Sequence, residues 1–250
     1  MSAALAIDDL SLTIGGALIL DGITLSVARN ETLGIIGPNG AGKTSLFNLL
    51  SGLRKPSRGR IYLGAEEITH MSPHHRAALG IARTFQTSSV FVNLTLLENV
   101  RIAAQAANGH SMNFTKNAYQ YPQLVELCHE YLEQVGLKAL AQHRAGSLSH
   151  GEKRLLEISL VLASKSEVIL LDEPMAGMSV ENVPALVEII RSLATVHKKT
   201  VLIVEHHMEV ILGLADRIAV LNYGELLVVD TPKNVIANPI VQSAYLGASL

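Results

Sequence analysis

The sequence predicts an α/β protein with a mixed central sheet, an antiparallel β layer and a lobe of helices. Apolar and polar residues alternate in LSLTI (10–14) and ITLSVA (23–28), which is typical of antiparallel strands with one buried face. Later in the chain, strand-like apolar runs alternate with helical segments, which predicts a parallel sheet. Between about 70 and 155, helical stretches such as QLVELCHEYLEQVGL (123–137) dominate, so we expect the helical lobe there.

Composition sets the outer limits on function. The 250 residues include 20 basic and 22 acidic ones, and no block of like charge indicates a nucleic-acid partner. The single cysteine, Cys128, excludes an internal disulfide and a CxxC zinc site, which is typical of a reducing cytoplasm. Charges interrupt every apolar run before the ~20 residues that cross a bilayer. The N-terminus lacks the basic and apolar regions of a signal peptide.

The individual elements follow in chain order. ETLGIIG (31–37) predicts a buried strand, and Leu46, Leu49, Leu50 and Leu53 recur at helical spacing directly after it. The polar segment from Asn108 to Pro122 predicts a mobile surface loop. The remaining predicted elements are strands in EVILLDEP (167–174) and TVLIVEHHM (200–208), each followed by a helix, and a hairpin around Tyr223-Gly224 in RIAVLNYGELLVVD (217–230).

GPNGAGKT (37–44) lies between the first predicted parallel strand and its helix, and it matches G-x-x-x-x-G-K-[ST]. Glycines allow a positive φ and let backbone N–H groups approach a ligand closely. In this pattern the amides surround phosphates, Lys43 reaches the terminal phosphates and the Thr44 hydroxyl reaches Mg²⁺. The following helix directs its dipole at the anion. We therefore expect a nucleotide site, with a non-binding turn as the simpler interpretation.

Two carboxylates end the strand VILLDEP. Asp172 is positioned to hold the hydration shell of Mg²⁺, and Glu173 to orient or deprotonate an attacking water. A turn after a strand is the simpler interpretation. In LSHGEKRLLEI (148–158), Ser149 and Glu152 have the spacing of a capping box, and the same helix N-terminus with Gly151 could bind an anion.

Five motifs, in their order and separations along the chain, resemble those of the nucleotide-binding subunit of an ABC transporter. They are GPNGAGKT, RTFQ, LSHGE, VILLDEP and VEHHM. The resemblance covers nearly the whole chain. It implies one P-loop NTPase domain of ABC type over 1–250, with a core in 1–69 and 156–250 and the helical lobe in about 70–155. It also implies ATP hydrolysis with Mg²⁺, and a head-to-tail dimer that holds two ATP molecules between the phosphate loop and the opposing signature LSHGE.

The resemblance also assigns roles to single residues. Glu173 would be the catalytic base, His206 the histidine that contacts the γ-phosphate, and Ala176–Ser179 the loop through which two subunits sense each other. From the residues alone, His206 and His207 are a surface pair or a weak metal site. Ile14 stands where the family often has an aromatic residue that stacks on adenine. The nucleotide contacts would come from Gly37, Pro38, Asn39, Gly40, Ala41, Gly42, Lys43, Thr44, Ser45 and Gln86, and from Ser149, Gly151 and Glu152 of the signature, with Thr44, Gln86 and Asp172 at Mg²⁺.

The longer segments GIARTFQTSSVFVNLTLLENV (80–100), DEPMAGMS (172–179) and NPIVQSAYLG (238–247) are most similar to ATPases of bacterial importers for branched-chain and related hydrophobic amino acids or amides, including urea. The 108–122 insertion is similar to the larger of the two ATPases of such systems. This resemblance implies permease subunits, a second ATPase subunit or a second copy, an indirect link to an external solute-binding protein, and a place on the cytoplasmic face of the inner membrane.

Three alternatives remain at this stage. A metabolic P-loop kinase would share GPNGAGKT but has no use for LSHGE. A repair or translation factor of ABC type usually carries two cassettes or a long coiled coil, whereas this chain has one cassette and no sustained heptads. The ATPase of an exporter, for example in lipid or lipopolysaccharide traffic, shares the same core motifs.

Overall fold

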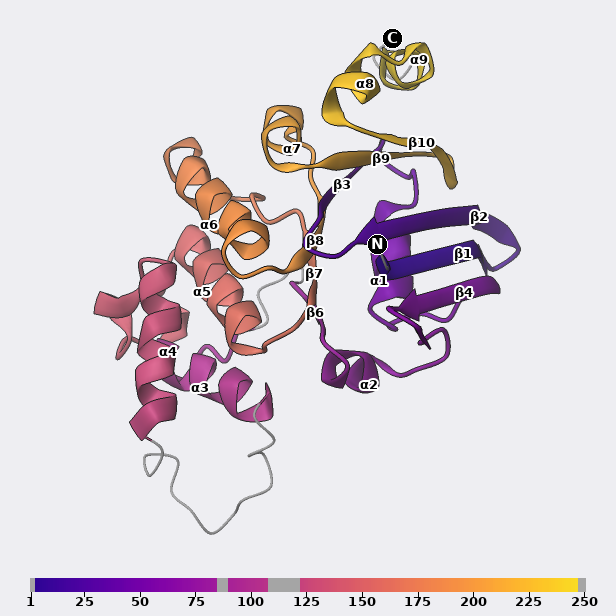
Figure 1. Cartoon of the computed structure of the whole chain (residues 1–250). Coiled ribbons are helices and arrows are strands. Elements are labelled where there is room, and N and C mark those ends of the chain that lie inside the picture. Colours follow the sequence, from indigo (N-terminus) through magenta and orange to yellow (C-terminus); the bar gives the residue numbers. More distant parts are fainter. Residues whose placement is uncertain (1–2, 85–89, 108–121, 247–250) are drawn as a thin grey trace.

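The computed structural model describes residues 3–84, 90–107 and 122–246 (Figure 1). Short 3₁₀ turns lie at Lys138–Leu140, Ala145–Ser147 and Val180–Asn182. The strands are β1 (Ala3–Ile14), β2 (Ala17–Ala28), β3 (Thr32–Ile36), β4 (Arg58–Leu63), β5 (Glu66–Glu67), β6 (Ile81–Arg83), β7 (Val168–Asp172), β8 (Thr200–Val204), β9 (Arg217–Asn222) and β10 (Glu225–Asp230). The helices are α1 (Lys43–Leu50), α2 (Pro73–Ala78), α3 (Leu96–Ala107), α4 (Pro122–Gln134), α5 (His150–Ala163), α6 (Val183–Thr195), α7 (Met208–Leu214), α8 (Pro232–Ala237) and α9 (Pro239–Leu246).

The described strands form two sheets. One is antiparallel with the order β2-β1-β4-β5, and the other has the order β10-β9-β3-β8-β7-β6. In the second sheet all neighbours are parallel except β10, which pairs antiparallel with β9 through the turn at Tyr223-Gly224. Both residues of that turn have a positive φ, 46° and 84°, as a two-residue hairpin turn requires. The predicted mixed sheet, antiparallel layer and hairpin are confirmed.

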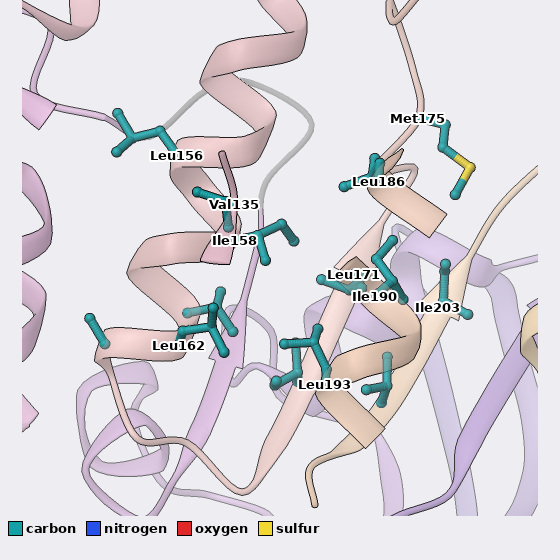
Figure 2. Packing of buried hydrophobic residues seen from close by; sticks show 14 of the residues in the cluster. Val135, Leu156, Ile158, Leu162, Leu171, Met175, Leu186, Ile190, Leu193 and Ile203 are labelled. Atoms are coloured by element: carbon teal, nitrogen blue, oxygen red, sulfur yellow. The ribbon is translucent and has the colours of Figure 1, made fainter. Parts of the chain in front are cut away.

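The parallel strands are buried on both faces, so they read as continuous apolar runs. Because side chains alternate along a strand, Ile169 and Leu171 of β7 face one side of the sheet while Val168 and Leu170 face the other. The first side is covered by α5 and α6, whose apolar side chains meet those of β7 and β8 (Figure 2). Residues at this contact include Ile158 and Leu162 of α5, Leu186, Ile190 and Leu193 of α6, and Ile203 of β8, whereas Leu156 points away from the opposite side of α5.

Helix α1 packs on the second side, between the central sheet and the antiparallel sheet (Figure 1). Its buried face consists of Leu46, Phe47, Leu49 and Leu50, each at most 1% exposed. The prediction that Leu53 continues this face is wrong, because α1 ends at Leu50 and Leu53 is 48% exposed. α1 and α5 therefore lie on opposite faces of the central sheet, which separates the two motifs they carry.

Helices α3, α4 and α5 pack against one another and form the helical part of the chain (Figure 1). The predicted limits of the helical lobe, 70 and 155, do not coincide with these elements. β6 pairs with β7 and extends the central sheet, and α5 is one continuous helix through position 155. A three-residue strand is too short to show periodicity, which is why the sequence did not separate β6 from the lobe. We propose that the lobe consists of α3 to α5. Most of the predicted mobile loop, 108–121, lies outside the described residues, and its last residue, Pro122, begins α4.

Arg76 of α2 links that helix to the end of α1. The side chain is 1% exposed, and its guanidinium donates hydrogen bonds to the carbonyl oxygens of Leu49, Leu50 and Thr69 at 2.5, 2.8 and 2.9 Å. Burial lowers the pKa of Arg76 to about 10, because desolvation disfavours the charged form. The last carbonyls of a helix have no partner within it, so Arg76 caps α1.

We expect Arg76→Met to lower the free energy of unfolding by about 2–3 kcal/mol, because several buried carbonyls lose their donor at once. Urea denaturation monitored by circular dichroism measures the change. Arg54→Met, at an exposed position after α1, is the matched control and should stay within about 0.5 kcal/mol of the parent. Equal stability of Arg76→Met and the parent chain would contradict the capping role.

Candidate functional site

The loop 37–44 connects β3 to α1 and requires glycine at two places. A Cβ on Gly37 would lie 2.2 Å from the carbonyl oxygen of Leu221 in β9, a distance that no side chain tolerates. Gly42 has a φ of 101° and would bring a Cβ within 2.5 Å of the Leu20 side chain. The loop therefore follows its path because strands β2 and β9 press against it. Asn39 and Gly40 at its tip are exposed.

Lys43 is enclosed by this loop. Its side chain is 7% exposed, and its ammonium donates hydrogen bonds to the carbonyl oxygens of Gly37 and Pro38 at 2.6 and 3.0 Å. Burial lowers the pKa of Lys43, while the negative charges of Glu173 and Asp172 act in the opposite direction. The loop thus holds a desolvated cation, which is the kind of group that binds an anion strongly.

The N-terminus of α1 is open to a ligand. Gly42 is its N-cap, no side chain caps its first N–H groups, and its first turn contains no acidic residue. Thr44 is exposed and Ser45 half-buried in that turn. Free N–H groups and the positive end of the dipole favour an anion, so this end of α1 fits a phosphate.

Two of the predicted catalytic residues lie in contact at the carboxyl edge of the central sheet. Glu173 follows β7, and its backbone N–H donates to the carbonyl oxygen of Val204 at the end of β8. Its Oε1 lies 2.8 Å from Nε2 of His206, the second residue after β8. Glu173 has a φ of 47°, a strained conformation that in non-glycine residues is concentrated at functional sites. The neighbouring strand ends thus bring together a carboxylate and an imidazole that are 33 positions apart.

Glu205, which the sequence did not single out, supports this pair. Its side chain is 4% exposed; Oε1 accepts a hydrogen bond from the N–H of Met175 at 2.8 Å, and Oε2 accepts one from the N–H of His206 at 3.0 Å. Glu205 therefore fixes His206 to the segment that leads into Ala176–Ser179. A carboxylate directly after a buried apolar strand, at the edge where Asp172 also lies, is the signal that would have found it.

Asp172 has one carboxylate oxygen bound and one free. Oδ2 accepts a hydrogen bond from Arg83 at 2.8 Å, whereas the buried Oδ1 has no hydrogen-bond partner among the residues that the structure describes. A buried acceptor without a donor suits a cation or its hydration shell. Asp172 and the Thr44 hydroxyl offer the oxygen ligands that Mg²⁺ prefers, so their chemistry fits the ion that the sequence predicts. Gln86, the third predicted ligand, lies outside the described residues.

The signature segment forms the N-terminus of α5, and its predicted capping box is confirmed. The Ser149 hydroxyl accepts a hydrogen bond from the N–H of Glu152, and the Glu152 carboxylate accepts from the backbone N–H and the hydroxyl of Ser149. These hydrogen bonds lower the pKa of Glu152. A Cβ on Gly151 would contact Met178 at 3.6 Å, so the segment adjoins Ala176–Ser179. Because α5 and α1 lie on opposite faces of the sheet, the fold does not bring Ser149 to the loop 37–45 of the same chain.

Two further sequence predictions concern single side chains. Ile14 ends β1 at the turn before β2 and is 38% exposed. His206 contacts Glu173, and within the described ranges no group of three His, Cys, Asp or Glu side chains could hold a metal ion.

Comparison with known proteins now places this site in a family. A family model described as ABC transporter matches residues 20–176, which include the loop 37–44, the signature segment and both carboxylates. The chain belongs to the ABC transporter family. It is the ATP-binding subunit, and it hydrolyses ATP.

This ABC subunit has relatives along its whole length. It is 35% identical to the high-affinity branched-chain amino acid transport ATP-binding protein BraF of Pseudomonas aeruginosa, over 97% of both chains. It is 32% identical to the lipopolysaccharide export system ATP-binding protein LptB of Acidithiobacillus ferridurans, over 99% of this chain and 98% of LptB. The crystal structure of a nucleotide-free ATP-binding cassette from an ABC transporter superposes with a TM-score of 0.84 at 29% identity, covering 98% of this chain and 99% of the other. None of the helices in the described ranges is both long and apolar enough to span a bilayer.

Proposed function

We propose that this ABC subunit powers a bacterial importer for branched-chain or other hydrophobic amino acids, or for related amides such as urea. The observation that carries the ATPase part is the convergence of Lys43, Asp172, Glu173 and His206 at one edge of the central sheet. The solute class rests on the segments noted in the sequence and on BraF, whose name specifies branched-chain amino acids.

In the proposed binding step, residues 37–45 surround the phosphates with backbone N–H groups. The Lys43 ammonium leaves the carbonyl oxygens of Gly37 and Pro38 and contacts the terminal phosphates. Little desolvation is needed at that moment, because Lys43 is already buried in the free loop. Thr44 and Asp172 would hold Mg²⁺, which would neutralise charge on the phosphate oxygens.

In the proposed hydrolytic step, Glu173 accepts a proton from the water whose oxygen attacks the γ-phosphorus. The bond from that phosphorus to the bridging oxygen breaks, and ADP and phosphate leave. The contact between Oε1 of Glu173 and Nε2 of His206 sets the direction of the carboxylate. The buried Glu205 in turn holds the backbone of His206, so the imidazole stays at the same edge of the sheet. His206 then meets the γ-phosphate from the side of β8.

We propose a head-to-tail dimer for the assembled state. Ser149, Gly151 and Glu152 lie on the opposite face of the sheet from α1, so they would contact the nucleotide of a second ATPase subunit or a second copy of this chain. The helix N-terminus at Ser149 favours an anion. Ala176–Ser179, which adjoins Gly151, would communicate between the two nucleotides. Closure would then depend on the difference in affinity of the closed dimer for ATP and ADP.

The proposed partners outside the dimer are membrane-spanning permease subunits, which hold this chain on the cytoplasmic face of the inner membrane. An external solute-binding protein would act on the permeases and thus only indirectly on this chain. No nucleic acid is expected, because the charge is balanced at −2 without a basic block.

Uptake of labelled solutes tests the proposal. We expect cells without this gene to lose uptake of leucine, isoleucine and valine, or of another neutral amino acid or urea, and to regain it with the intact gene. The Lys43→Ala variant should fail to restore it, because the loop loses its cation. Unchanged uptake of every solute, in cells without a redundant system, would contradict the importer.

The similarity to LptB favours an exporter as the second candidate. The same deletion strain distinguishes the two, because loss of an exporter would leave uptake unchanged and reduce lipopolysaccharide or lipid at the cell surface.

A further inference from the structure

Arg83 connects the helix of the phosphate loop to the acidic end of β7. It is the last residue of β6, and its side chain is 6% exposed. Nη1 donates hydrogen bonds to Oδ1 of Asn48 at 2.8 Å and to Oγ of Ser51 at 3.0 Å, both on or next to α1. Nη2 donates to Oδ2 of Asp172 at 2.8 Å. The guanidinium carbon also lies 5.7 Å from the centre of the Phe47 ring.

These contacts determine how the Asp172 carboxylate is oriented. Arg83 binds Oδ2, and the backbone N–H of Asp172 donates to Oγ1 of Thr84, the next residue along, at 3.3 Å. With Oδ2 held in this way, the torsion of the side chain is fixed. The buried Oδ1, which lacks a hydrogen-bond partner among the described residues, is the oxygen left for a cation.

Stability alone does not explain this ion pair. Both partners are desolvated, at 6% and 1% exposure, and the attraction within a buried pair often no more than offsets that desolvation. Arginine is the residue that can make all three contacts, because its planar fork donates in fixed directions to the amide, the hydroxyl and the carboxylate. Lysine would bring the charge without the fork. The arrangement is thus built for direction as much as for charge.

We propose that Arg83 is a positioning residue for ATP hydrolysis, which turns Asp172 so that Oδ1 faces the Mg²⁺ bound with the nucleotide. The inference rests on the proposed function, in which Asp172 supports that ion. Through Asn48 and Ser51, Arg83 also holds α1 at a fixed distance from β7. The phosphate loop, 37–44, therefore keeps its position relative to Asp172 and Glu173. Arg83 acts through Asp172 and does not itself touch the nucleotide.

The test separates metal-dependent from metal-free nucleotide binding, and it uses the purified full chain. The affinity of a fluorescent, non-hydrolysable ATP analogue is measured with Mg²⁺ and again with EDTA, for the parent chain, Arg83→Met and Arg83→Lys. We expect Arg83→Met to reduce the gain in affinity due to Mg²⁺ by about tenfold or more, because the loss of a residue that orients a metal-binding side chain has an effect of this size. The affinity measured with EDTA should not change. Arg83→Lys, which keeps the charge, should retain part of the gain.

Two controls make the result specific. Arg217→Lys alters a similar pair, in which Arg217 at the start of β9 contacts Glu31 at 2.7 Å at the opposite end of the sheet, and it should change neither affinity. Asp172→Asn should lose the gain due to Mg²⁺. Circular dichroism verifies folding, and if Arg83→Met does not fold, Arg83→Lys and Arg83→Gln carry the test.

The outcomes distinguish this inference from the proposed function. An equal loss of affinity with Mg²⁺ and with EDTA would show that Arg83 only maintains the fold, and an unchanged gain in Arg83→Met would show that it does not position Asp172; either overturns the inference. If the parent chain gains nothing from Mg²⁺, or Asp172→Asn keeps the gain, the metal role of Asp172 in the proposed function is itself wrong.

Discussion

Glu173→Gln is expected to lower the rate of ATP hydrolysis by about 10²–10⁴-fold, the usual contribution of a positioned general base. Nucleotide binding should persist, because glutamine occupies the same volume and its amide can keep the hydrogen bond to Nε2 of His206. With hydrolysis blocked, an ATP-bound dimer should accumulate. Phosphate release gives the rate, and light scattering with excess Mg-ATP gives the mass.

Glu188→Gln is the matched control for this variant. Glu188 lies on α6, 68% exposed, in a surface pair with Arg191, so its change to glutamine should leave the hydrolysis rate unaltered. Hydrolysis by Glu173→Gln at a rate within about threefold of the parent, far less than a lost base costs, would contradict the assignment of Glu173 as the base.

Lys43→Met is expected to abolish stabilisation by ATP without loss of stability in the free protein. At 100 times the dissociation constant, a ligand stabilises the folded state by about 2.7 kcal/mol, which raises the melting temperature of a chain of this size by roughly 5–10 °C. Lys43 is buried in the free loop and burial lowers its pKa, so its removal also removes a desolvated charge. This gain offsets the lost hydrogen bonds to the carbonyl oxygens of Gly37 and Pro38, so we expect a free-state melting temperature close to that of the parent.

Thermal unfolding with and without Mg-ATP measures both quantities. Lys55→Met, at an exposed position beyond α1, removes the same charge outside the loop and should keep the full shift with ATP. A shift in Lys43→Met as large as in the parent would contradict the role of Lys43. A large fall in the melting temperature of its free form would contradict the account of its burial.

The elements that the sequence predicted correctly are those with a strong local signal. β3, β7 and β8 are continuous apolar runs, because both faces of the parallel sheet are covered. The capping box of Ser149 and Glu152 depends only on residues three apart, so its geometry is written in the local sequence.

What the sequence left out depends on tertiary neighbours. β6 is three residues long and ends in a charged residue, so it carries no periodic signal; it becomes a strand because β7 offers a free edge. The partners of Arg83 lie 32, 35 and 89 positions away, and no local pattern encodes such contacts. The hydrogen bond of Glu205 to the N–H of Met175, 30 positions earlier, is likewise not encoded locally, although the place of Glu205 directly after β8 is a local signal.

The same distinction applies to the candidate site. The residues of 37–45 were predicted together because they are contiguous, whereas the contact of Glu173 with His206 requires that β7 and β8 be neighbours. The separation of Ser149 from the loop 37–45 follows from the opposite placement of α1 and α5, which periodicity alone does not reveal.

A cross-link between the phosphate loop of one subunit and the signature segment of the other tests the proposed head-to-tail dimer most directly. Asn39 and Ser149 are exposed, and the native Cys128 is buried, with a thiol pKa raised to about 11 by desolvation, so it gives no background reaction. In a chain with Glu173→Gln, Asn39→Cys and Ser149→Cys, a short bifunctional thiol reagent should yield a cross-linked dimer with Mg-ATP and none without nucleotide or in either single-cysteine chain. Cross-linking that is independent of ATP, or that occurs with one of the two cysteines alone, would contradict the head-to-tail closure around ATP.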